Sequence, residues 1–285
     1  MAILAVDLAY RSWNDLGVVV LDRDRNWKAP AGSALGLLGP PIHCEIFPSL
    51  ADPGETGPLV TQIIDPNILA GRLNHLCTQR DIRVLLLDGP QAWKSRHNGL
   101  EHARVSERQL NCAAKTGLPG MVKPVTYRAF AEFCVDVFDA LCRRGWRRLE
   151  TRDRASVAQP CAGNQRVPER VLVESYPHAA WKSLGLKPLP SKRRCRVSDL
   201  AEAYAALNAL MPFTTNRPPN HDQLQAIVGG IPGLALDEHN AAGARIVGNP
   251  PCREDGQWRE GFIVLPIPPA IPSGSVHIPG MKWLN

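Results

Sequence analysis

Three short apolar segments of this chain each end in an acidic residue, and this pattern restricts the fold more than any other feature. They are Ala2–Val6 before Asp7, Val84–Leu87 before Asp88, and Val171–Val173 before Glu174. A short, continuous apolar run is typical of a strand that is buried on both faces. We therefore expect a sheet that helices cover on both sides, with acidic side chains where the strands end.

The other elements follow in an order that favours a mixed sheet. Strands are predicted at 16–21, 42–47, 243–248 and 261–266, and the first two are joined to their neighbours by short connections. Helices are predicted to begin at Asp65, Thr126 and Asn220, which are good N-cap residues, and Pro232 is expected to limit the last of them. Hairpins followed by alternating helices and strands predict an α/β domain with helices on the faces of its sheet.

Composition narrows the class of protein. The 285 residues are 44% hydrophobic and 21% charged, as in ordinary globular proteins. No apolar run approaches the ~20 residues that span a bilayer, so we expect no membrane association. The eight cysteines form no C-x-x-C pair, and we interpret them as reduced, mostly buried thiols of a cytoplasmic protein. Nothing in the sequence indicates the oligomeric state.

Charge and motifs favour some functions over others. The formal net charge of 33 − 27 = +6 favours a polyanionic partner such as nucleic acid. The sequence contains no G-x-x-x-x-G-K-[ST] loop, no G-x-S-x-G elbow and no H-E-x-x-H helix. These absences weigh against P-loop kinases, serine hydrolases and zinc proteases.

The acidic residues are the candidate chemistry. Besides the three strand-end acids, Asp222 lies in the first turn of the helix predicted to begin at Asn220. Carboxylates that converge at the edge of a sheet repel one another unless a cation lies between them, and oxygen ligands suit Mg²⁺ or Mn²⁺. The alternative for each strand-end acid is a turn or cap residue, and for Asp222 an acid that favours the helix N-terminus.

Several segments together resemble a known family. They are AILAVDLA, VLLLDGP, RVSERQLN, VLVESYPHAAWKSLGL, NHDQLQAI and GFIVLP, in this order along the chain. This set resembles the DUF429 family of predicted ribonuclease-H-like nucleases. The resemblance implies one ribonuclease-H-like domain over residues 1–285, with an insertion around 90–168. It also implies metal-dependent hydrolysis of phosphodiester bonds at Asp7, Asp88, Glu174 and Asp222, which would act as metal ligands and catalytic residues. Gln225 departs from the family, since many relatives carry a second acid there.

Basic residues are candidates for holding the phosphate backbone of a nucleic acid. Arg104 and Arg108 are four residues apart and could present one helix face. Lys187, Arg193 and Arg194 belong to a basic segment at 187–196 that could bind through counterion release. The alternative for both groups is an ordinary solvated surface.

Two other functions fit the same sequence. The first is a nucleic-acid-binding protein that keeps the fold without catalysis, a possibility that Gln225 favours. The second is a relative of the actin-like nucleotide-binding ATPases, which share strand-end acids but generally need two such lobes.

Overall fold

The structure is a computed structural model, and it describes residues 2–23, 40–52, 63–150, 170–238 and 243–268. The last part of the predicted insertion, residues 151–168, lies outside the described residues.

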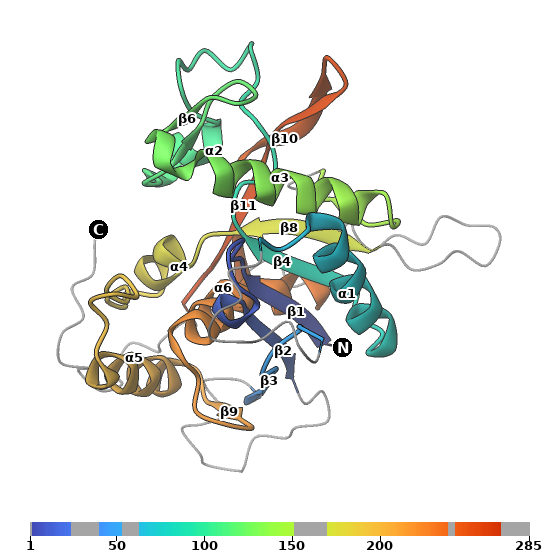
Figure 1. The fold of residues 1–285 in the computed structure, drawn as a ribbon. Coiled ribbons are helices and arrows are strands. Elements are labelled where there is room, and N and C mark those ends of the chain that lie inside the picture. The colour runs from blue at the N-terminus through green and yellow to red at the C-terminus, as the bar shows by residue number, and fades with distance from the viewer. Residues whose placement is uncertain (1, 24–39, 53–62, 151–169, 239–242, 269–285) are drawn as a thin grey trace.

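A mixed sheet forms the centre of the molecule, and within the described ranges it has nine strands (Figure 1). They are β1 (Ala2–Asp7), β2 (Gly17–Arg23), β3 (Ile42–Ile46), β4 (Val84–Asp88), β7 (Arg147–Arg148), β8 (Val171–Ser175), β9 (Phe213–Thr215), β10 (Ala244–Glu254) and β11 (Gln257–Pro266). Their order is β10-β11-β8-β4-β1-β2-β3-β9, and β7 also pairs with β8.

The directions of the strands match the predicted fold class. Strands β1, β2 and β3 are consecutive and antiparallel, whereas β4 runs parallel to β1 and β8 runs parallel to β4. Two hairpins followed by parallel strands with helical crossovers form the ribonuclease-H-like order. The prediction of an α/β fold with a ribonuclease-H-like mixed sheet is therefore confirmed, and so is the terminal strand pair, β10 and β11.

Helices cover both faces of this sheet, as the continuous apolar strands predict. Figure 1 shows α1 and α3 together on one side, while α6 crosses the other side close to α4. The bounds are α1 (Pro66–Gln79), α2 (Val105–Leu110), α3 (Arg128–Cys142), α4 (Pro177–Ser183), α5 (Val197–Leu210) and α6 (His221–Asp237). Two short strands, β5 (Lys115–Thr116) and β6 (Val122–Lys123), form a separate hairpin.

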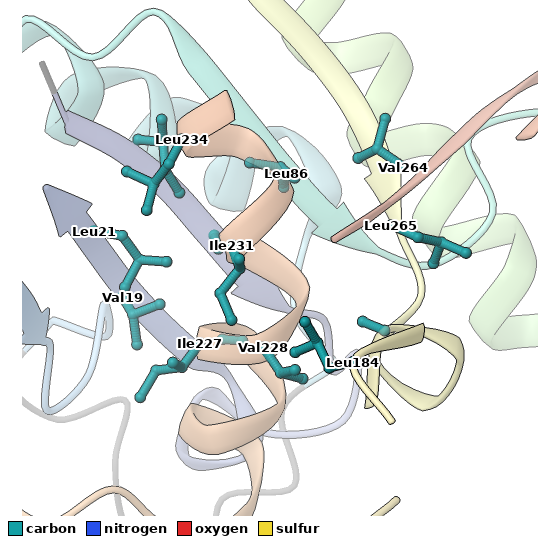
Figure 2. Close-up of a cluster of buried hydrophobic side chains, with 14 of the residues drawn as sticks. Val19, Leu21, Leu86, Leu184, Ile227, Val228, Ile231, Leu234, Val264 and Leu265 are labelled. Carbon is teal, nitrogen blue, oxygen red and sulfur yellow. The ribbon is translucent and has the colours of Figure 1, made fainter. Parts of the chain in front are cut away.

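The core has two layers because side chains alternate along each strand. Ile3 and Ala5 of β1 pack on the α6 side, and Leu4 and Val6 pack on the α1 and α3 side. Figure 2 shows the first layer, in which Leu86 from the sheet meets α6. This alternation also decides which face each strand-end acid occupies.

Helix α6 continues through Pro232 to Asp237, so the prediction that Pro232 limits it is wrong. A proline inside a helix costs about 3 kcal/mol, and this helix is buried along nearly its whole length, which offsets that cost. Its glycines allow the close approach: a Cβ on Gly230 would lie 2.6 Å from Ala5 Cβ, and one on Gly233 would lie 2.3 Å from Leu86 Cδ1. The helix therefore lies directly on β1, β2 and β4.

The predicted helix starts have mixed outcomes. Asp65 and Asn220 cap their helices through their side chains, as predicted. Thr126 instead lies in the short 3-10 turn η3 (Val125–Tyr127), and α3 begins at Arg128. The packing of the folded chain, and not the capping preference of Thr126, decides where this helix begins.

Two predictions from composition also have outcomes. No helix in the described part of the chain is long and apolar enough to cross a membrane. The described cysteines are free thiols, and four of them, Cys44, Cys77, Cys112 and Cys134, are buried. Cys161 lies outside the described residues.

Candidate active site

Two of the predicted acids lie side by side at the ends of parallel strands. Asp7 of β1 is the register partner of Asp88 of β4, and neighbouring strands are about 4.8 Å apart. Ala5 and Leu86, two residues before Asp7 and Asp88, pack on the α6 side of the sheet. Because side chains alternate along a strand, Asp7 and Asp88 project on that side as well. The two carboxyl groups are close enough to interact, and the charge of Asp88 raises the pKa of Asp7.

The environment of this pair disfavours two negative charges. Burial raises the pKa of Asp7 well above its ordinary value, and the charges of Asp88 and Asp222 raise it further. Burial also raises the pKa of Asp88 to about 7, although a hydrogen bond from Asp7 opposes that rise. Among the described residues, neither carboxylate forms an ion pair with a basic side chain. The pair is therefore a place where a cation would be stabilised.

The chemistry of the pair fits one hard divalent ion. Mg²⁺ is commonly held by one or two carboxylates, with water and substrate phosphate oxygens as its remaining ligands. Within the described ranges, no group of three or more His, Cys, Asp or Glu side chains has the geometry to hold a metal ion. Asp7 and Asp88 therefore fit an ion that solvent or substrate would also coordinate, and the four carboxylates do not form a complete cage as placed.

Asp222 reaches the same region from α6. Its backbone lies against Gly17, which is the register partner of Asp7, and a Cβ on Gly17 would lie 2.2 Å from the Asp222 carbonyl oxygen. The Asp222 side chain is only 8% exposed, and its charge contributes to the raised pKa of Asp7. The first turn of α6 is thus held beside the strand-end pair by backbone contact.

Lys192 and His221 contact the Asp222 carboxylate, and the sequence did not single out either of them for this role. The Lys192 ammonium contacts the carboxylates of both Asp222 and Asp15, and its distance to Asp15 Oδ1 is 2.6 Å. His221 Nδ1 lies 3.1 Å from Asp222 Oδ1. Only the folded chain brings Lys192 to Asp222, since no local pattern links the two.

Glu174 lies near enough to Asp88 for its charge to raise the pKa of Asp88, but the register gives its side chain another direction. Leu87 is the partner of Glu174, and Asp88 is the partner of Ser175. A shift of one residue turns a side chain to the other face of the sheet, so Glu174 follows Leu172 toward the α1 and α3 side. Asp88 and Glu174 therefore both end an apolar strand, but their side chains project from different faces of the sheet.

Both oxygens of Glu174 are already bonded. Arg104 donates from Nη1 to Oε2 at 2.6 Å and from Nη2 to Oε1 at 2.8 Å, and the Gln91 N–H donates to Oε2 at 3.0 Å. Burial raises the pKa of Glu174, and these contacts offset part of that rise. As placed, Glu174 is an ion-pair partner, and its predicted role as a metal ligand stays a prediction.

Arg104 is buried, so the prediction that it presents an exposed helix face with Arg108 is wrong, and its contact with a substrate stays a prediction. It is 0% exposed and lies between Glu174 and Glu107, whose Oε1 accepts from Arg104 Nη2 at 2.9 Å. Burial acts to lower the pKa of Arg104, but the two carboxylates outweigh this and raise it. Arg104 precedes α2 as its N-cap, so it shares no face with the exposed Arg108.

The remaining basic candidates are exposed. Lys187, Arg193 and Arg194 all face solvent in the segment between α4 and α5. Lys187 also lines a cavity of about 180 Å³ together with Trp181. Their predicted contact with a phosphate backbone stays a prediction. Gln225 is used in packing, since its Oε1 accepts from Trp181 Nε1 at 2.8 Å.

Comparison with known proteins adds little to this geometry. No family model matches the chain, and no curated protein matches it. Among solved structures, the chain is similar to Thermus thermophilus RuvC, with 9% sequence identity and a TM-score of 0.35. The match covers 84% of this chain and 97% of RuvC. A likeness this distant carries no argument about the site, whose chemistry depends on the strand order and on the contacts of its own residues.

Proposed function

We propose that this protein is a metal-dependent phosphodiesterase that hydrolyses nucleic acid at Asp7 and Asp88, as its resemblance to the DUF429 family implies. The observation that carries the proposal is the pair itself. Two half-buried carboxylates lie in register on parallel strands, and desolvation together with the neighbouring carboxylates raises the pKa of each. A protein that needed these residues only for its fold would gain stability by replacing one of them with a neutral side chain.

In this proposal Asp7 and Asp88 would hold one Mg²⁺ or Mn²⁺ ion. Such an ion, when bound, supplies positive charge to a phosphoryl oxygen and makes water more acidic. In the hydrolysis, a water oxygen forms a bond to phosphorus, the P–O ester bond breaks, and the leaving oxygen takes up a proton. Asp222 lies beside the pair, where its carboxylate can orient the water and accept its proton.

The surrounding residues would bind the substrate and support the pair. Lys187, Arg193 and Arg194 are exposed on the segment that also carries Lys192, so they can contact phosphates along a nucleic-acid strand. Glu174 and Arg104 would act as positioning residues, because Glu174 binds the Gln91 N–H just after the strand that bears Asp88.

A second candidate is nucleic-acid binding without cleavage. It is favoured by Gln225, which makes a packing contact with Trp181 at a position where many members of the family carry an acid. It is also favoured by the engagement of both Glu174 oxygens, which leaves the site with fewer free carboxylates.

Cleavage of labelled DNA and RNA, single- and double-stranded, in Mg²⁺, in Mn²⁺ and in EDTA tests the proposal. We expect wild-type cleavage that EDTA abolishes and that Asp7→Asn reduces by at least about 100-fold, since it removes a ligand of the ion. Asp255→Asn is the matched control, because Asp255 is an exposed carboxylate in the β10–β11 hairpin and should leave cleavage unchanged. Equal cleavage by wild type and Asp7→Asn would contradict the proposal. Binding of the panel without any cleavage would establish the second candidate.

A further inference from the structure

The candidate active site contains a positive charge that belongs to the chain. Lys192 Nζ lies between two carboxylates from different elements, Asp15 in the turn η1 (Trp13–Asp15) after β1 and Asp222 in the first turn of α6. Both carboxylate groups contact the same nitrogen atom, so they converge on one point in space. Two converging carboxylates without a cation between them would repel each other.

The segment that carries Lys192 is fixed on both sides of it. On the N-terminal side, Leu189 is 8% exposed, and the Pro190 carbonyl lies 3.0 Å from His221 Nε2. On the C-terminal side, the Arg194 and Cys195 N–H groups donate back to the Ser191 carbonyl at 2.7 and 3.0 Å and close a turn around Lys192. The ammonium is therefore placed by the fold and is not a freely moving surface charge.

Lys192 is also connected to the strand-end pair through Asp222. Asp222, whose carboxylate Lys192 contacts, has its backbone against Gly17, the register partner of Asp7. The Lys192 side chain remains 50% exposed, so the same ammonium that contacts Asp222 is open to a ligand in solvent. It thus lies between a buried carboxylate and the side from which a substrate would approach.

We infer that the Lys192 ammonium takes the place of a second metal ion, so that the site binds one divalent cation at Asp7 and Asp88. This inference rests on the proposed function. Two-metal sites place a second ion where it balances carboxylate charge and faces the substrate phosphate. Here Lys192 has both properties, and a lysine ammonium is a compact point charge that suits a single phosphate oxygen.

Counting bound Mn²⁺ tests this inference without relying on activity. Titration of the full chain with Mn²⁺, followed by electron paramagnetic resonance of the free ion, should give one bound ion for the wild type. Lys192→Met should bind two, because it leaves Asp15 and Asp222 facing each other without a cation. Lys192→Arg keeps the charge and should bind one, and Lys182→Met, which removes an exposed lysine from α4, should also bind one.

A second pair of variants locates each ion. Asp222→Asn in the Lys192→Met background should return the count from two to one, whereas Asp7→Asn in the wild type should remove the first ion. Thermal melting by circular dichroism confirms that each variant is folded. Two ions in the wild type, or an equal count in wild type and Lys192→Met, would overturn the inference and leave the proposed function standing. No Mn²⁺ bound by the wild type at millimolar concentration would overturn both.

Discussion

Two groups of carboxylates lie near the ends of β1, β4 and β8, and they differ in whether a basic side chain of the protein pairs with them. Asp7 and Asp88 face α6 and have raised pKa values. Glu174 and Glu107 face the other way and enclose the guanidinium of Arg104. Among the described residues no basic side chain pairs with the first group, which a bound cation could neutralise, whereas Arg104 pairs with both carboxylates of the second. The contrast shows that a strand-end acid becomes a candidate catalytic residue only when the fold leaves it without a cation.

The largest effect should come from breaking the group around Arg104. Arg104→Met leaves Glu174 and Glu107 buried without a positive charge, and we expect it to lower the free energy of unfolding by about 3–5 kcal/mol. Chemical denaturation measures this change. Arg108→Met is the matched control, since Arg108 is exposed on α2, and its effect should stay within about 0.5 kcal/mol. Similar effects of the two variants would show that the buried group does not stabilise the fold.

The same amide substitution should have opposite effects in the two groups. Asp88→Asn removes one of two repelling carboxylates, so at pH 8 in EDTA it should raise the free energy of unfolding by roughly 2 kcal/mol. The folded-state pKa of Asp88 is about 7 against an ordinary value of 3.8, so the folded wild type takes up a proton as the pH falls through 7. Wild-type stability therefore rises toward pH 5, and the advantage of Asp88→Asn should shrink there. If Asp88→Asn were more stable than the wild type by the same amount at pH 5 and pH 8, the Asp7–Asp88 pair would not be the source of its extra stability.

Glu174→Gln should be destabilising by about 1–3 kcal/mol, because it weakens two charge-assisted hydrogen bonds from a buried guanidinium. Denaturation at pH 8, beside Asp88→Asn, gives the comparison directly. If Glu174→Gln were stabilising instead, the two groups would not differ in their balance of charge.

The smallest expected effect is the stabilisation by bound Mn²⁺, which should depend on the first group and not on the second. Mn²⁺ at ten times its dissociation constant should stabilise the wild type by about 1.4 kcal/mol, seen as a rise of a few degrees in Tm. Glu174→Gln should keep this gain and Asp88→Asn should lose it. Loss of the gain in Glu174→Gln would instead return Glu174 to the set of metal ligands that the family resemblance implies.

The sequence predicted most of the sheet, because its strands are continuous apolar runs. The same reasoning predicted that Asp7 and Asp88 meet, since both end such runs and parallel strands end at one edge. It could not predict the register, and a difference of one residue separates Glu174 from them. It also treated Arg104 as part of a helix face, whereas Arg104 is the buried residue before α2.

The residues that sequence reasoning missed lie on connections. Lys192 was one lysine in an exposed basic run, and Asp15 lay in a short turn. Their meeting at Asp222 depends on how two loops pack against the start of α6, and no periodic pattern records such a contact. Tertiary packing also extended α6 past Pro232, where local preference favoured an end.

Gly17 has a consequence for how this chain can vary between species. A methyl group at position 17 would lie 2.2 Å from the Asp222 carbonyl oxygen, so any larger residue there must displace the start of α6. Position 17 carries no functional group, yet it sets the spacing between Asp7 and Asp222. Natural variants that replace Gly17 should therefore also change residues 220–222, and the two positions should covary as a unit across an aligned family.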